Sequence, residues 1–512
     1  MYKRLIIFTA LLGSVLSAYA QITPQYYNNA LLFSSQFYDG TARSVAMGNA
    51  MTALGGDLGA LSYNPAASGV YRYTEITLTP SVYSSITNTS FLGNTMQADK
   101  SRLSLSNVGW VGSFETGRTR GLLNFNFAIT ANQSNNFAYR SSGSGIQSSS
   151  SYLGSLAYGM TGIDANSLTM PENDPTLPFY RNPSSWVLGW NSGLVDTVAN
   201  GLFRGATESI DKDGKFYIPG SLNQSYYRER TGYVEDIIIN ASGNISDIFF
   251  FGVNLTLQSI WMNEFTSISE IAGDPDLFDT GFTDFTREYR MTTSGLGVNV
   301  EAGFIVRPVA GLTIGGSIST PTWMYLNETW MESMNGNTGL GRAALDSPLG
   351  ESSYRLTSPF RWNLGVGYTL GGFLALAVDY ERTDYSDIFL SDNNGNRNAF
   401  QYDNEYISTY YQAVNNVRAG IEAWPIPQLA LRLGYNYYSS PDRDFDFSRH
   451  YASAGIGFRA LSGFFIDLAY QQQCNQSDNN YLLYDSYETF EAPVTSERFR
   501  DWKILLTLGW RF

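Results

Sequence analysis

The chain has 512 residues, of which 15% are charged and 15% are aromatic, and it contains 49 glycines and 35 tyrosines. This composition is poor for a soluble helical enzyme, and the formal net charge of −14 argues against nucleic acid or anionic lipid as a partner. Beyond the N-terminus there is no run of about 18 apolar residues, which excludes transmembrane helices and leaves a closed barrel as the only way across a membrane.

Residues 1–20 have the pattern of a secretory signal peptide. Lys3 and Arg4 precede an apolar run, and Ala18-Tyr19-Ala20 forms an Ala-x-Ala cleavage site. The alternative is a short anchor helix, but the apolar run is too short to span a bilayer. The single cysteine, Cys474, lies far from the cleavage site, so the sequence predicts neither a disulfide nor an N-terminal lipid anchor.

Residues 21–69 precede the first strand-like segment and favour short helices. Ser44–Leu54 suits one helix, Gly55-Gly56 breaks it, and Asp57 is placed to cap a further helical turn. Asn64-Pro65 then ends that turn, because the residue before a proline avoids helical backbone angles.

From residue 70 onward the dominant pattern is a period of two, which is typical of strands with one apolar and one polar face. Residues 502–512 show it best, with tryptophan near both ends of the apolar face. Fourteen such segments can be counted, so the sequence predicts an all-β protein, a 14-stranded antiparallel transmembrane β-barrel over residues 70–512. An even number of strands is usual in this class. The fourteen strand segments are 70–80, 101–113, 123–129, 229–243, 249–257, 296–306, 311–325, 362–368, 374–380, 410–424, 429–435, 448–460, 464–470 and 502–512.

Polar residues decide which face of each strand points into the lumen. A lipid-facing Arg or Lys costs about 2–4 kcal/mol at mid-membrane, so the polar face must line the interior. The residues assigned to the lumen are Asn124, Asn254, Glu301, Asp379, Glu381, Arg432 and Asp467. Seven tryptophans near strand ends suit two aromatic girdles, namely Trp110, Trp261, Trp323, Trp362, Trp424, Trp502 and Trp510.

Short turns alternate with longer connections, as periplasmic turns and extracellular loops do. In the second strand, apolar Leu103 and Leu105 change parity to Val108 and Trp110 across Asn107. This change predicts a β-bulge or kink; the alternative is a weakly patterned strand in another register.

The longest loop, residues 133–228, carries an apolar stripe at intervals of four residues. Such spacing predicts one helix face. The stripe could line a hydrophobic capture groove and bind substrate, or it could pack down onto the barrel mouth, which is the commoner role of an apolar stripe. Its members are Trp186, Trp190, Leu194, Val198 and Leu202.

The segment between Gly40 and Gly69 resembles the FadL/TodX family of outer-membrane transporters for hydrophobic compounds. The family's Gly-Ala-Arg-like start, Met-Gly-x-Ala helix, Ala-Asp break and Asn-Pro-Ala motif map to Thr41-Ala42-Arg43, Met47-Gly48-Asn49-Ala50, Gly56-Asp57 and Asn64-Pro65-Ala66. The resemblance implies that residues 21–69 form a small helical hatch plugging the lumen. It also implies capture on an extracellular groove, movement of the hatch, and lateral release beside a kinked strand, which the family usually has on its third strand.

The function expected from the resemblance is passive uptake of long-chain fatty acids or other hydrophobic small molecules through the outer membrane of a Gram-negative cell. The alternative is an accessory barrel in protein secretion or surface attachment, similar to PorV. One large acidic loop would suit this accessory role. That loop holds Glu264, Glu270, Asp274, Asp276, Asp279 and Asp284.

No enzyme, catalytic residue, metal site or cofactor is expected. The only histidine, His450, has no recognisable nucleophile motif to serve, and two Asp-rich turns, at 211–214 and 392–396, lack full calcium-loop spacing. The expected partners are the lipid bilayer, a hydrophobic substrate, and the barrel-assembly machinery through the terminal Phe512. We expect a monomer.

Overall fold

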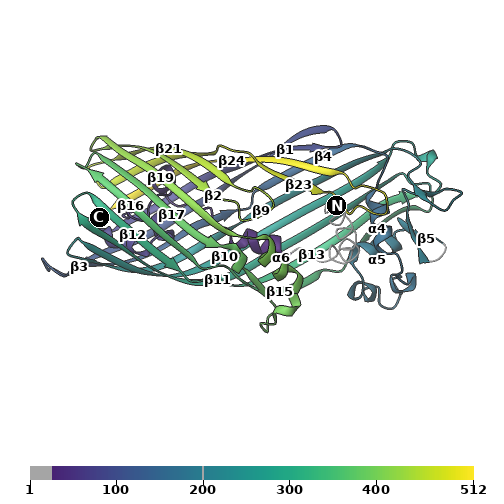
Figure 1. Ribbon diagram of the computed structural model, residues 1–512, viewed down its shortest axis with the longest axis horizontal. Coiled ribbons are helices and arrows are strands. Elements are labelled where there is room, and N and C mark those ends of the chain that lie inside the picture. Colours follow the sequence, from purple (N-terminus) through teal and green to yellow (C-terminus); the bar gives the residue numbers. More distant parts are fainter. Residues whose placement is uncertain (1–25, 199–200) are drawn as a thin grey trace, which may run out of the picture.

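The computed structural model describes residues 26–198 and 201–512, so the predicted signal peptide lies outside the described residues. One large antiparallel sheet closes on itself where β1 (Glu75–Phe91) pairs with β24 (Val494–Arg511), from Glu75↔Arg511 to Phe91↔Thr495. The result is the long, tilted barrel of Figure 1.

The wall contains the fourteen strand positions that the sequence predicted. At two of these positions the wall strand is divided into two consecutive pieces, β12 with β13 and β15 with β16. The remaining wall strands are β2 (Asn94–Glu115), β3 (Leu122–Asn136), β9 (Leu222–Ile245), β10 (Phe249–Ala272), β11 (Asp284–Val309), β12 (Leu312–Ser319) with β13 (Trp323–Thr338), β15 (Gly350–Thr357) with β16 (Arg361–Leu370), β17 (Leu374–Asp384), β19 (Ala413–Ile426), β20 (Leu429–Tyr438), β21 (Arg449–Arg459) and β22 (Phe464–Gln473).

Further short elements lie in the connections between the wall strands, several of them at the right end of the barrel in Figure 1. The extra strands are β4 (Tyr139–Gln147), β5 (Val195–Thr197), β6 (Phe203–Gly205), β7 (Ser209–Ile210), β8 (Phe216–Tyr217), β14 (Gly341–Asp346), β18 (Phe389–Ser391) and β23 (Ser477–Leu482). The helices are α4 (Tyr152–Gly159), η4 (Ala165–Ser167), η5 (Leu177–Tyr180), α5 (Ser184–Asn191), η7 (Pro275–Leu277), η8 (Tyr385–Asp387), η9 (Arg397–Phe400) and α6 (Gln401–Tyr410). In the described part of the chain, no helix is both long enough and apolar enough to cross a membrane.

Burial alternates along the wall strands as the period of two predicted. On β10, Phe251, Val253 and Leu255 are exposed on the outside, whereas Asn254 between them is buried. All seven polar residues assigned to the lumen are likewise buried. The exposed apolar band on the outside of the wall marks the membrane-facing surface.

The strands are longer than the sequence predicted. β10 and β11 remain paired up to Ile271↔Asp284, although the outward residues there include Asn263, Ser267 and Ser269. Both faces of the sheet are polar or mixed above the membrane band, so the alternation that marks a lipid-facing strand is lost there while the backbone pairing continues.

The segment before β1, residues 26–73, lies among inward-facing wall residues and contains α2 (Tyr26–Ser34), α3 (Ala42–Ala46), η2 (Gly59–Ser62) and η3 (Pro65–Val70). The predicted helix over Ser44–Leu54 is wrong in its extent, because the chain leaves the helix after Ala46. Gly48 and Asn49 have φ values of 59° and 57°, which end a right-handed helix.

Candidate functional site in the barrel lumen

The N-terminal segment, residues 26–73, meets the wall backbone to backbone at Met47 and Gly48. A Cβ added to Gly434 would lie 2.0 Å from the Gly48 nitrogen, and one added to Gly420 would lie 2.2 Å from the Met47 carbonyl oxygen. Any side chain at these wall positions would therefore push the segment away. Glycines serve the same close approach elsewhere around the wall, at Gly252, Gly303 and Gly315.

Asn64, Pro65 and Ala66 attach the second half of this segment to β9 and β11. The Asn64 amide donates to the Phe304 carbonyl at 2.9 Å, and its oxygen accepts from the Ala66 N–H at 3.0 Å. The Pro65 carbonyl accepts from the Asn240 amide at 2.8 Å. All three residues of the motif are buried. The motif therefore serves to hold the N-terminal segment against the barrel wall.

Asp57 joins the two halves of the segment. Its carboxylate accepts from the Thr41 hydroxyl at 2.7 Å and from the Gly59 N–H at 2.9 Å. The prediction that Asp57 is the N-cap of the next helical turn is wrong by one residue, because the N-cap of η2 is Leu58, which makes no side-chain cap bond.

A buried charge network holds α3 against the wall. Arg43 donates to Glu422 at 2.8 Å, and Arg432 bridges Glu422 at 2.7 Å and Asp467 at 2.5 Å. The side chains of Glu422 and Arg432 are 0% and 1% exposed. Two cations and two anions thus neutralise one another where water does not reach, so the loss of any one partner would leave an unpaired buried charge.

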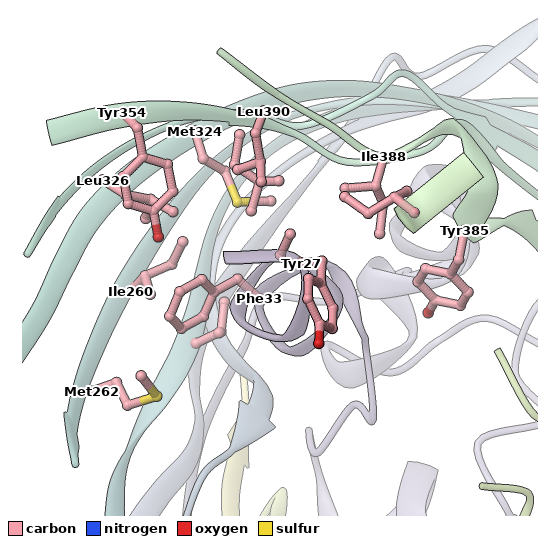
Figure 2. Packing of buried hydrophobic residues seen from close by; sticks show 14 of the residues in the cluster. Tyr27, Phe33, Ile260, Met262, Met324, Leu326, Tyr354, Tyr385, Ile388 and Leu390 are labelled. Atoms are coloured by element: carbon pink, nitrogen blue, oxygen red, sulfur yellow. The ribbon is translucent and has the colours of Figure 1, made fainter. Parts of the chain in front are cut away.

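Above this network, α2 fills an apolar chamber of the lumen. Figure 2 shows Tyr27 and Phe33 projecting from α2 among residues of the surrounding wall. The chamber is rich in methionine, whose flexible thioether side chain adapts to differently shaped neighbours. The residues around α2 include Ile260, Met262, Met291, Met324, Leu326, Tyr354 and Leu356 of the wall strands, and Ile388, Leu390 and Ile407 of the connection between β17 and β19.

Backbone pairing in the wall is interrupted between β2 and β3. The two strands pair only from Asn107↔Asn132 to Glu115↔Asn124. At the start of the interruption Ser106 is bulged, because Thr79 pairs with Asn107 while the next residue of β1, Pro80, pairs with Leu105. The bulge predicted from the parity change in the second strand is therefore confirmed.

The third strand bends inward at the same place, towards the N-terminal segment. The carbonyls of Gln133 and Ser134 accept from the N–H groups of Asp39 and Phe37, at 2.9 and 2.8 Å. Phe137, just beyond the bend, packs in the apolar chamber with its ring 5.7 Å from that of Phe33. The interruption therefore adjoins the chamber.

Arg102 of β2 spans the interruption. Its guanidinium donates to the carbonyl of Gly232 on β9, and its Cζ lies 4.8 Å from the centre of the Tyr233 ring. A side chain thus replaces the missing backbone pairing at this level of the wall. The sequence offers no sign of this role, which depends on the inward bend of the intervening strand.

Residues 148–198 and 201–221, which we call the cap, close over the long-loop end. Trp186 and Leu194 are 7% and 0% exposed and belong to an apolar cluster that includes Phe282, Phe285 and Met334 at the tops of the strands. These two members of the predicted stripe pack downward, whereas Trp190, Val198 and Leu202 remain partly exposed.

The prediction of one continuous helix through the stripe is wrong. Helix α5 ends at Asn191, so only Trp186 and Trp190 lie on it. Gly193 turns the chain with a φ of 68°, and Leu194, Val198 and Leu202 follow in or beside the β5–β6 hairpin. The interval of four continues past the turn without forming a helix face.

Two buried carboxyl groups anchor the cap. Glu270 accepts from the Tyr152 N–H and the Gln224 amide, both at 2.7 Å. Glu208 accepts from the Gly205 N–H at 3.1 Å. Burial raises the pKa of each carboxyl group to about 7, because these hydrogen bonds only partly replace water.

The fold is similar to those of two solved transporter-type barrels. The toluene transporter TodX of P. putida gives a TM-score of 0.52 at 12% identity, covering 94% of this chain and 99% of TodX. A FadL homologue of Pseudomonas aeruginosa gives a TM-score of 0.55 at 14% identity, covering 94% of this chain and 100% of the homologue. No protein-family model and no curated protein sequence matches the chain.

Both structures superpose on nearly the whole chain, including the closed wall of the barrel. At 12% and 14% sequence identity, this similarity shows a shared fold and nothing finer. The chain has the FadL/TodX fold, that of a 14-stranded outer-membrane β-barrel.

Proposed function

We propose that the barrel is an outer-membrane channel for passive uptake of long-chain fatty acids or other hydrophobic small molecules. The observation that carries the proposal is the apolar chamber around α2, which adjoins the wall interruption through Phe137. Each CH₂ group moved from water into such a chamber contributes about 0.8 kcal/mol, so a long chain binds without a charged anchor. The fold of TodX, which is described as a toluene transporter, supports the same substrate class.

Capture takes place at the cap. Of the residues that we assigned to substrate binding, Trp190, Val198 and Leu202 are partly exposed and are the members available to an arriving molecule. Trp186 and Leu194 support them from below, where Leu194 packs against Gly336 of β13. Substrate then passes from the cap towards the chamber.

The N-terminal segment acts as a hatch. Tyr27, Ala30 and Phe33 of α2 occupy the chamber, so a substrate enters only as α2 gives way. Release is lateral, through the interruption between β2 and β3, because no backbone hydrogen bond between these strands has to break there. The substrate thus passes into the membrane without crossing the closed lower lumen.

The test is a reversible cross-link in a Cys474→Ser background. The hydroxyls of Ser68 on η3 and Ser242 on β9 lie 2.7 Å apart, so S68C/S242C would tie the segment to the wall. The matched control is S269C/T286C, which joins β10 to β11 across a hydroxyl distance of 3.1 Å. Uptake of labelled dodecanoate and toluene is measured before and after reduction.

We expect S68C/S242C to take up substrate only after reduction, whereas the control is active in both states. Uptake no faster than in cells without the barrel would overturn the proposed function. Uptake by oxidised S68C/S242C would show that η3 stays on β9 during transport, and would overturn a movement of the whole segment while leaving a movement of α2 alone.

The accessory-protein alternative gains no specific support from the acidic loop. Glu264 pairs with Arg228 and Arg230, and Asp279 pairs with Arg204. Asp284 pairs with Arg342 and Glu270 is buried in the cap. Asp274 caps η7, and Asp274 and Asp276 are both exposed carboxylates, too few for an acidic docking surface.

A further inference from the structure

A small cavity with both polar and aromatic side chains in its lining lies beside the wall interruption, on the lumen side. It is bounded by Phe37–Asp39 of the N-terminal segment, by Asn135 and Asn136 of the inward bend, and by wall residues that include Tyr83 and Asp501. Its volume is about 30 Å³, room for about two water-sized groups. It can hold the polar end of a molecule but not an alkyl chain.

Two of the residues that line this cavity each carry a buried polar atom with no hydrogen-bond partner among the described residues. One is Oδ1 of Asp501, a residue only 4% exposed, and the other is Nδ2 of Asn136. The orientation of the Asn136 amide is set by its oxygen, which accepts from the Ala138 N–H at 2.9 Å. One unused acceptor and one unused donor thus belong to residues at the cavity wall, and each costs free energy while it remains unpaired.

The charges around the cavity are already balanced. Lys503 pairs with Asp39, and the Arg449 guanidinium lies 3.9 Å from the other oxygen of Asp501. The Tyr451 hydroxyl also donates to that oxygen, at 3.4 Å, and the Tyr83 phenol faces the same carboxylate. An additional anion would meet two carboxylates with both cations already engaged, so a neutral group fits better.

We propose that this cavity binds the hydroxyl group of a neutral amphipathic molecule, such as a long-chain alcohol. The hydroxyl donates to Asp501 Oδ1 and accepts from Asn136 Nδ2, while the alkyl chain lies towards the interruption and the apolar chamber. The proposal rests on the proposed function and narrows its substrate class, because it distinguishes alcohols from molecules with the same chain and no hydroxyl donor.

The experiment compares binding of 1-dodecanol, dodecyl methyl ether and dodecanoate to the purified full-length barrel by calorimetry. The ether keeps the chain and the oxygen but cannot donate to Asp501. A hydrogen bond to a charged group is worth about 1.5–3 kcal/mol, so we expect the alcohol to bind about tenfold or more tightly than the ether.

Two variants remove the unused groups separately, Asp501→Asn and Asn136→Ala. Each should reduce the preference for alcohol over ether, while affinity for the ether stays within about twofold. Asn327→Ala, on the outer wall, is the matched control and should keep the full preference. Circular dichroism checks that each variant has folded as a barrel.

Equal affinity of the wild type for alcohol and ether would overturn the inference, since the cavity would then hold water only. A preference that survives in both variants would overturn it as well. If the ether and dodecanoate bind but the alcohol has no advantage, the proposed function stands without the inference. If none of the three molecules binds, both fail.

Discussion

At the scale of single residues, buried charges hold the N-terminal segment against the wall, and Glu422 is the carboxylate that joins the two. Glu422 accepts from both Arg43 and Arg432. In Glu422→Gln the two guanidinium groups lose their shared carboxylate, which costs about 3–5 kcal/mol for a buried pair. We expect the segment to loosen, so that trypsin cleaves after Arg43 in the variant and not in the wild type.

The matched control for this variant is Glu288→Gln. Glu288 pairs with Arg290 on the outer surface, where both side chains are more than a third exposed, and such a pair is worth about 0–1 kcal/mol. Mass spectrometry of the fragments identifies the cleavage site. Continued protection of Arg43 in Glu422→Gln would show that the network does not hold the segment.

Gly434 gives a second prediction at this scale. In Gly434→Ala the new methyl group would lie 2.0 Å from the backbone nitrogen of Gly48, and overpacking of this kind costs about 1–3 kcal/mol. We expect the segment to shift and ion conductance in planar bilayers to rise.

Gly316→Ala is the control for Gly434→Ala, because its new methyl group meets only the ends of side chains and no backbone: ring atoms of Phe304 at 2.9 Å and Leu364 Cδ2 at 3.2 Å. Its conductance should match that of the wild type. Equal conductance of all three proteins would mean that contact between Gly48 and the wall does not seal the lumen.

At the scale of elements, the cap is held by carboxyl groups that prefer to be neutral. The pKa of Glu270 and of Glu208 is raised from 4.5 to about 7 by burial. A raised folded-state pKa stabilises the packed cap fully below about pH 4.5, and this stabilisation is lost as the pH rises through about 7. We expect faster hydrogen exchange in α4 at pH 8 than at pH 5, after correction for intrinsic rates.

The double variant Glu208→Gln/Glu270→Gln is expected to remove most of this pH dependence, since a neutral amide keeps the acceptor oxygen without a titratable proton. Exchange in α4 that slows as the pH rises in the wild type would contradict the sign. A pH dependence unchanged in the double variant would place its origin in other groups.

The elements differ in how far their sequences could predict them. Along β10 lipid demands an apolar residue at every second position, so alternation alone locates the strand. No such demand acts on the stripe from Trp186 to Leu202, and its regular spacing continues past Gly193, where the backbone turns. A spacing that fits a helix therefore predicted α5 correctly up to Asn191 and failed beyond it.

At the scale of the whole molecule, long-range contacts decide the features that matter most for function. The wall glycine Gly434 is needed because Gly48 touches it, although the two are far apart in the chain. Likewise, Arg102 meets Gly232 only because the third strand bends inward between them. Local patterns predicted the bulge at Ser106, since a change of parity is visible in one strand. They could not predict the inward bend, which is fixed by bonds to Phe37 and Asp39.

The same contacts predict how the intact barrel treats different solutes. The N-terminal segment is bonded to several wall strands inside the barrel, and under the proposed function it closes the lumen to water-soluble molecules. Hydrophobic molecules instead have the chamber and the interruption. The barrel should therefore separate the two classes of solute, as a water-filled porin of similar strand number would not.

The most direct measurement is the rate at which whole cells, with and without the protein in the outer membrane, accumulate labelled dodecanoate, toluene and sucrose. We expect the protein to accelerate entry of dodecanoate and toluene and to leave sucrose entry unchanged. Faster entry of sucrose with no gain for the two hydrophobic molecules would contradict the proposed function.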